Sequence, residues 1–232
     1  MKKRFTLKLA LLLSAVVLWT GLPSSAQSPS EKGLHFANGP SDAIPVVNSA
    51  LKNPPFIQGH PLLADFGGLQ VLPPLARYNL LIPETTATSA LSVQAEGWEY
   101  LIKSSLRSGE GVAAVSVRTT ATGNSQMLSL QYENIAGPEV RALEKLAALE
   151  QIRSGSYEVR LLQVFGLVGN NPVQIIWLKP DSGDADLFYE PLSPNPNLSS
   201  KLQFEKLYSR EDFLKVAKGN PRGARGTVPA IN

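Results

Sequence analysis

Cysteine is missing from the 232-residue sequence, and histidine occurs only twice, at His35 and His60. Without cysteine the protein has no disulfide bond, no thiolate metal site and no thiol nucleophile. Neither a Gly-x-Ser-x-Gly nor a His-Glu-x-x-His motif occurs, which argues against a serine hydrolase of that type and against a zinc protease. We therefore interpret both histidines as surface or packing residues.

The amino terminus has the pattern of a signal peptide. Lys2, Lys3, Arg4 and Lys8 precede an apolar run from Leu9 to Trp19, and small residues at Ser24 and Ala26 follow a helix-breaking Gly-Leu-Pro. This pattern predicts cleavage after Ala26 and export to the bacterial periplasm or the extracellular space. The apolar run is shorter than the roughly 20 residues that span a bilayer, so we expect no integral membrane span after cleavage.

The positive net charge comes from this segment. The whole chain carries +3, but four of its 22 basic residues and none of its 19 acidic residues lie in residues 1–26. The remainder has 18 basic against 19 acidic residues. A general electrostatic attraction to nucleic acid is therefore not expected.

Residues 27–90 contain nine prolines, which restrict the backbone and remove hydrogen-bond donors. We predict a proline-rich extended arm, partly disordered and mobile to about Asn53. Its second part is expected to lie on the domain, with an edge strand around Ala76 to Ile82. A globular domain follows over residues 91–218, and a flexible tail over 219–232.

The fold class predicted for residues 91–218 is α+β, a mostly antiparallel sheet with two or three packed helices. Spacing of Trp98, Leu101, Ile102 and Leu106 favours a helix within residues 89–109, with a strand over Trp98 to Ile102 as the alternative. Alternation on both sides of a Gly-Asn turn predicts a β-hairpin from Gly111 to Asn134.

The next segments are more strongly patterned. Residues 137–155 predict a helix, with Pro138 in its first turn, Glu139 at its positive end and Gly155 as a left-handed cap. Apolar runs predict strands over 157–165 and 173–178, covered on both faces. Two short strands (187–189 and 202–207) and a helix capped by Ser209 complete the prediction.

A possible internal repeat relates two parts of the domain. A shift of 46 residues aligns Arg107-Ser108-Gly109 with Arg153-Ser154-Gly155 and brings both Gly-Asn pairs into register. If the repeat is real, residues 91–133 and 138–179 form two αββ units that share one sheet. Such short identities also arise by chance, so a chance match stays open.

Candidate sites are few. The acidic turn "PDSGDAD" could offer oxygen ligands from Asp181, Asp184 and Asp186 to a cation such as calcium, although a hairpin turn explains the same residues. A glycosidase would need two converging acids. The candidates by residue type are Glu96, Glu99, Glu110 and Glu133.

The sequence therefore predicts an exported, non-catalytic binding or structural domain that uses no cofactor. Its partner would be a protein or another component of the bacterial envelope. Two alternatives stay open: a secreted hydrolase that uses Asp and Glu, and a protein-interaction module that docks through the proline-rich arm.

Overall fold

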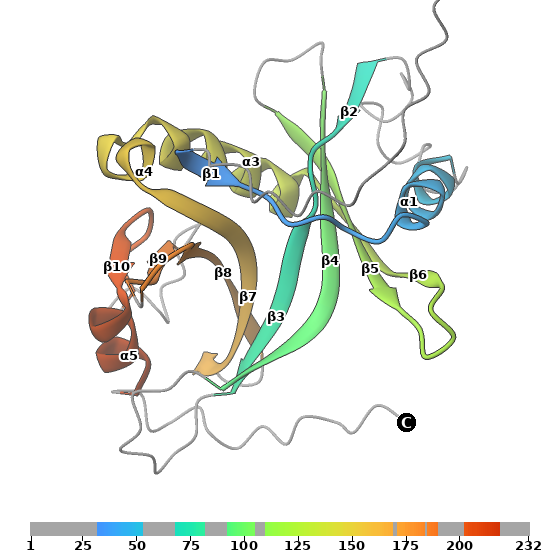
Figure 1. Cartoon of the computed structure of the whole chain (residues 1–232). Coiled ribbons are helices and arrows are strands. Elements are labelled where there is room, and N and C mark those ends of the chain that lie inside the picture. Colours follow the sequence, from blue (N-terminus) through green and yellow to red (C-terminus); the bar gives the residue numbers. More distant parts are fainter. Residues whose placement is uncertain are drawn as a thin grey trace, which may run out of the picture.

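The computed structural model describes residues 32–52, 68–81, 92–104, 110–168, 171–183, 185–189 and 202–218. Within these ranges the chain forms one ten-stranded mixed sheet and four helices (Figure 1). The helices are α1 (Ala43–Leu51), α3 (Glu133–Ala148), α4 (Glu150–Ser154) and α5 (Arg210–Lys218). The predicted α+β class with a mostly antiparallel sheet is confirmed.

The strands run from β1 to β10 along the chain, and most neighbours are antiparallel. They are β1 (Gly33–His35), β2 (Leu69–Val71), β3 (Leu75–Leu81), β4 (Val93–Ser104), β5 (Gly111–Thr119), β6 (Ser125–Tyr132), β7 (Ser156–Val168), β8 (Asn171–Pro180), β9 (Leu187–Tyr189) and β10 (Leu207–Ser209). Their spatial order is β10-β9-β8-β7-β3-β4-β5-β6. In addition, β1 pairs with β7 and β2 pairs with β4.

The strand predicted around Ala76 to Ile82 is present as β3, but its position at an edge is wrong. β3 lies between β7, to which it is parallel, and β4, to which it is antiparallel. The prolines that argued against a central strand, Pro73 and Pro74, precede β3, so its own N–H groups are free to pair. Residues of the proline-rich region therefore form the middle of the sheet.

The helix favoured within residues 89–109 is wrong, because Val93–Ser104 forms the long strand β4. Both faces of β4 are covered, so its apolar residues do not show a simple period of two. Leu101 packs with α3, while Tyr100 and Ile102 pack with α1 on the opposite face. Gly97 is required for a close approach, since a Cβ there would lie 2.3 Å from the carbonyl oxygen of Val117.

The hairpin is confirmed as β5 and β6, and the strands over 157–165 and 173–178 are confirmed within β7 and β8. Because β4 replaces the first expected helix, residues 91–133 and 138–179 do not share an αββ order. The strand predicted over 202–207 is displaced, since β10 begins at Leu207. Helix α5 is confirmed, and the hydroxyl of Ser209 accepts a 3.2 Å hydrogen bond from the Asp212 N–H.

Helix α3 begins four residues before the predicted start, because β6 leads directly into it at Glu133. Pro138 therefore lies inside the helix rather than in its first turn. The early turn packs closely on β5, where a Cβ at Gly111 would lie 2.3 Å from the Ala136 carbonyl oxygen. The helix is interrupted at Leu149, and Gly155 has an extended rather than a left-handed backbone.

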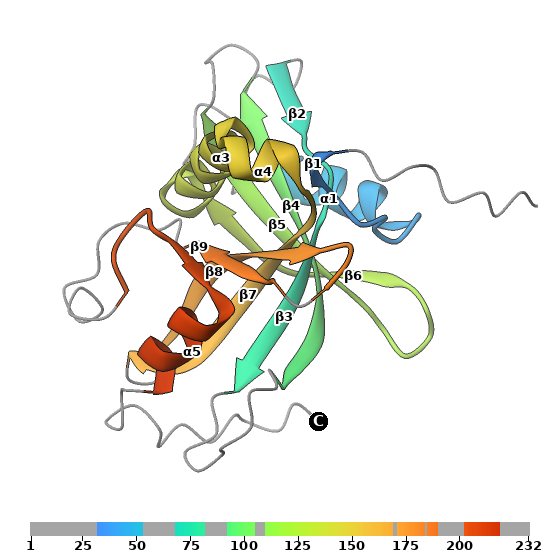
Figure 2. The same ribbon diagram turned by 60° about the vertical axis from the view of Figure 1, so that its left-hand side comes forward.

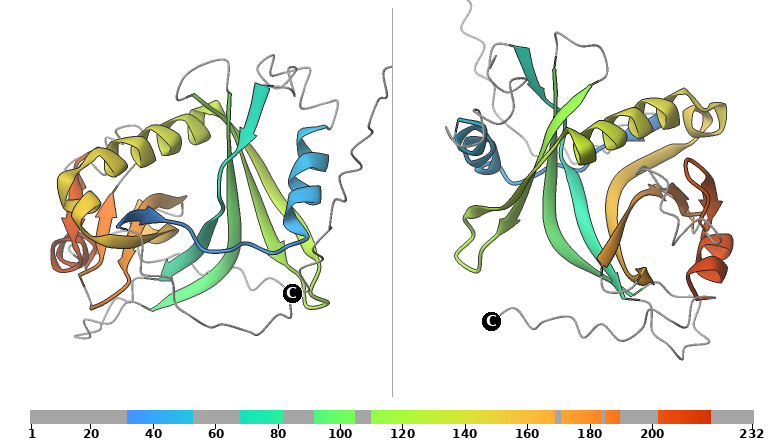
Figure 3. Two further views of the ribbon diagram at one scale, coloured as in Figure 1. Left: turned by 45° about the horizontal axis from the view of Figure 1, so that its top comes forward. Right: turned by 180° about the vertical axis from the view of Figure 1, so that it is seen from behind.

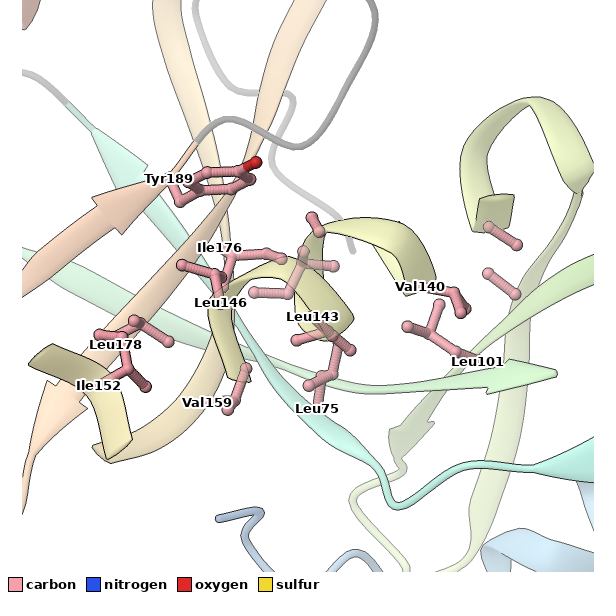
Figure 4. Close-up of a cluster of buried hydrophobic side chains, with 14 residues drawn as sticks. Leu75, Leu101, Val140, Leu143, Leu146, Ile152, Val159, Ile176, Leu178 and Tyr189 are labelled. Atoms are coloured by element: carbon pink, nitrogen blue, oxygen red, sulfur yellow. The ribbon is translucent and has the colours of Figure 1, made fainter. Parts of the chain in front are cut away.

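The sheet is covered on both faces. Helices α3 and α4 cover one face, which we call the α3 face, as Figure 4 shows for the central apolar side chains. The other face packs on α1 at the β5–β6 end and on α5 at the β8–β10 end (Figures 2 and 3). Two apolar clusters, one around α1 and one around α5, lie on this same face. Ala76 and Tyr78 are two residues apart on β3 and so point to one side of the sheet. Ala76 lies opposite Trp98, which packs in the α1 cluster, while Tyr78 packs in the α5 cluster.

Several predictions concern residues outside the described ranges. They are the signal peptide over residues 1–26, the environment of His60 and the tail over 219–232. Among the described helices, none combines the length and the apolar character needed to cross a membrane.

Candidate functional site

An apolar groove of about 290 Å³ lies between α3 and two segments that precede β3. Its apolar walls include Leu34, Phe36, Leu72, Val140, Leu143 and Ala147. Pro73 lies at one side, and two charged residues, Lys103 and Glu144, complete the lining. The volume is close to the lower end of the range of about 300–1,000 Å³ that is typical of small-molecule pockets.

The helical wall of this groove follows from the pattern of α3. Val140, Leu143 and Ala147 are spaced three and four residues apart, so they form one stripe along the helix. Val140 and Leu143 are buried against the sheet, whereas Ala147 is exposed to solvent. The small side chain of Ala147 keeps this part of the groove open.

The other wall is held by a hydrogen-bonded set that fastens β1 to the sheet. The imidazole of His35 lies 2.7 Å from one carboxylate oxygen of Asp181, and the other oxygen accepts a 2.5 Å hydrogen bond from Ser156. The Gly33 N–H donates to the carbonyl of Gly155 at 2.7 Å. These contacts fix the strand that carries Leu34, and Phe36 directly follows it.

Asp181 is charged over most of the pH range. The hydrogen bond from Ser156 and, to a smaller extent, the interaction with His35 lower the pKa of Asp181 below its ordinary value of 3.8. A carboxylate that accepts hydrogen bonds is favoured in its ionised form. The interpretation of His35 as a packing residue is thus consistent with its contact in β1. Its partner, Asp181, is one of the three aspartates that the sequence suggested as cation ligands.

Lys103 is the cation of the groove. It lies on β4 opposite Gln70 of β2, on the same side of the strand as Leu101. Its side chain is half-buried, and it has no ion-pair partner among the residues that the structure describes. Glu144 also lines the groove but is exposed on α3 and does not form an ion pair with Lys103.

A second group of charged residues lies below the first half of α3, and all of them except the half-buried Glu96 are buried. Arg77 of β3 lies 3.3 Å from Glu99 and 3.1 Å from Glu96, both of β4. Ser116 of β5 donates a 3.0 Å hydrogen bond to Glu99 and is also in contact with the guanidinium of Arg77. Ser129 of β6 donates to Ser116 at 3.0 Å. We call these residues, with Glu139, the buried ionic cluster.

Glu139 is the helical member of this cluster, and its side chain is fully buried. Burial and the negative charge of the nearby Glu99 raise the pKa of Glu139 well above its ordinary value of 4.5. The protonated, uncharged form of Glu139 is therefore favoured in the folded protein. The prediction that Glu139 lies at the positive end of the helix dipole is wrong, because the helix begins at Glu133.

The structure does not gather the acidic turn into a calcium site among the residues that it describes. Asp181 accepts from His35 and Ser156, while Asp186 is buried and accepts a 3.0 Å hydrogen bond from the Trp177 indole. Lys179 and Arg210 also lie within 3.6 Å and 3.4 Å of Asp186. Asp184 lies outside the described residues, so the three-aspartate site stays a prediction.

Of the candidate acids for a hydrolase, the structure brings Glu96 and Glu99 together and adds Glu139. The side chains of Glu99 and Glu139 have no exposed surface, which leaves a substrate no direct access to them. Sequence reasoning missed Glu139 as a buried residue, although a signal exists. It lies three and seven residues before Ala142 and Leu146, on the apolar stripe of the helix.

Lys103 and the groove were also missed. The spacing of Val140, Leu143 and Ala147 was visible, but the residues on the other wall come from segments about 70 and 100 residues earlier in the chain. Comparisons with protein-family models, with curated proteins and with solved structures found no match to this chain.

Proposed function

We propose that the protein is an exported, non-catalytic domain that binds a small apolar ligand in the groove between α3 and β1. The observation that carries this proposal is the groove itself, which has apolar walls on three segments and a volume of about 290 Å³. Apolar surface that lines a groove favours a ligand that removes the same surface from water. Export rests on the signal-peptide pattern of residues 1–26.

The non-catalytic part of the proposal rests on the position of the carboxylates. The acid pair that converges, Glu99 and Glu139, is fully buried in the ionic cluster, and Arg77 lies next to Glu99. Acid–base catalysis requires that a reacting group come within hydrogen-bond distance of the acid. A cluster closed in this way favours a role in the fold over a hydrolase.

Octanol titrated into the mature protein tests ligand binding, with ¹H–¹⁵N NMR spectra as the readout. The expected result is a saturable set of shifts at backbone amides of the groove, including those of Leu34, Leu72 and Leu143. An Ala147→Trp variant should abolish these shifts, because the larger side chain fills the groove. Ala148→Trp is the matched control, since Ala148 is the next exposed residue of α3 and does not line the groove.

Absence of saturable shifts in the wild-type protein would contradict the proposal. The same holds if the shifts persist in Ala147→Trp but disappear in Ala148→Trp. Cell fractionation, combined with determination of the amino terminus of the mature protein, tests export separately. A chain that retains residues 1–26 in the cytoplasm would contradict that part.

A further inference from the structure

We infer that the groove selects a small monocarboxylate with an apolar chain, and that Lys103 pairs with its carboxylate. This inference rests on the proposed binding function and names the ligand class. Its first support is the environment of Lys103, a half-buried cation among the apolar residues of the groove. A charge in such surroundings loses hydration, so it gains more from an anionic partner than an exposed lysine would.

Three other cations with restricted exposure have acidic partners, whereas Arg118 contacts the amide oxygen of Gln126 instead. Arg77 lies 3.1 Å from a Glu96 oxygen, Arg160 lies 2.8 Å from a Glu158 oxygen, and Lys179 lies 3.6 Å from an Asp186 oxygen. Lys103 differs from these three because it has no ion-pair partner in the described part of the chain. Within the described residues, an external anion can therefore bind Lys103 without displacing a carboxylate.

The size and charge of the groove restrict the anion. At about 290 Å³ it accommodates one short chain rather than two long acyl chains. Lys103 is the single cation of the lining, and Glu144 adds a negative charge at the exposed side. This balance favours a monoanion over a phosphate with two charges, because each additional negative charge meets Glu144 rather than a second cation.

A negative charge next to an apolar chain occurs both in free carboxylic acids and at the surface of a membrane that contains acidic lipids. The groove favours the free acid, because its apolar walls can cover a short chain that has left the bilayer. The occupant that we propose is accordingly a free aliphatic or aromatic monocarboxylate of about the size of octanoate.

The experiment compares octanoate with octanol on the full mature chain, using the groove amides in NMR spectra as the readout. We expect octanoate to bind about tenfold more tightly than octanol at neutral pH and low salt, since a charge-assisted contact contributes on the order of 1.4 kcal/mol. In Lys103→Gln the affinity for octanoate should fall about tenfold, to that of octanol, and the affinity for octanol should be unchanged.

Two control variants separate the local contact from net charge. Lys215→Gln makes the same change of charge on an exposed residue of α5, and it should leave both affinities unchanged. Glu144→Gln removes the acid of the groove and should strengthen octanoate binding about twofold, with no effect on octanol. Thermal unfolding of each variant verifies that the protein is folded before binding is measured.

The outcomes distinguish the inference from the proposed function. Equal binding of octanoate and octanol in the groove, unchanged in Lys103→Gln, would overturn the role of Lys103 and leave the groove as a binding site. No binding of either compound would overturn both. Binding to vesicles with acidic lipids, without a response to octanoate, would overturn the choice of a free acid.

Discussion

Helix α3 packs over two sites with charged residues, the buried ionic cluster and the groove. They differ in whether each charge has a partner of opposite sign. In the buried ionic cluster, Arg77 forms ion pairs with two glutamates, and burial next to Glu99 raises the pKa of Glu139. In the groove, half-buried Lys103 has no acidic partner among the described residues. The first arrangement is complete within the protein and suits a structural role, whereas the second leaves a charge for a ligand.

The largest expected effect on stability comes from removing the cation of the buried ionic cluster. Arg77→Met should lower the free energy of unfolding by about 3–5 kcal/mol, because it leaves the buried carboxylate of Glu99 without its cation. Urea denaturation at neutral pH measures this change. Arg118→Met is the control, since Arg118 contacts the amide of Gln126 at the exposed end of β5 and should change stability by less than about 0.5 kcal/mol.

A double variant sharpens this interpretation. If the loss in Arg77→Met comes from the uncompensated charge, then adding Glu99→Leu should restore part of it, because the charge is removed as well. A double variant that loses the sum of both single effects would contradict the electrostatic explanation and indicate packing instead.

The raised pKa of Glu139, in the same buried ionic cluster, predicts that stability depends on pH. Because its pKa is raised in the folded protein, the folded state holds a proton that the unfolded chain loses above its ordinary pKa of 4.5. The free energy of unfolding should therefore fall as the pH rises from 4.5 to the raised pKa, with a slope of at most about 1.4 kcal/mol per pH unit from this group.

Glu139→Gln should remove this slope, because glutamine keeps a hydrogen-bond donor and does not ionise. Urea unfolding across a pH series gives the measurement. Glu144→Gln, at an exposed position of the same helix, should keep the wild-type slope. An unchanged slope in Glu139→Gln would show that another group causes the pH dependence.

The smallest expected effect concerns the wall of the groove. Asp181→Asn should lower the free energy of unfolding by less than about 1 kcal/mol, since its contacts with His35 and Ser156 are exposed. It should also speed hydrogen exchange at the Gly33 amide and weaken octanol binding about twofold, because β1 is held less firmly. Protection of Gly33 equal to the wild type would contradict this role.

The pH provides an independent test of the same contacts. The pKa of Asp181 is lowered in the folded protein, so its contribution to stability is present above the ordinary value of 3.8 and is lost as the pH falls through the lowered pKa. Ser156→Ala should reduce this dependence while it leaves the contact between His35 and Asp181 in place.

Several parts of the fold follow from local patterns. The alternation in β5 and β6 with the Gly-Asn turn, and the continuous apolar run of β7, are visible in the sequence and are confirmed. At β4 a helix was favoured over the alternative of a strand from Trp98 to Ile102, because Leu101 packs on one side and Ile102 on the other, which hides the period of two. Over such a short run, the spacing of apolar residues in an amphipathic helix resembles that in a strand buried on both faces.

The sequence by itself determined the alternating hairpin, the strands that are buried on both faces and the absence of cysteine chemistry. Short-range periodicity is sufficient for these features, because each depends on neighbouring residues. The tertiary structure alone decided that β3 is central, that Glu139 meets Glu99 and Arg77, and that Lys103 shares a groove with Leu34 and α3. Pairing between distant segments fixes these contacts, and the spacing within any one segment carries no information about its partner.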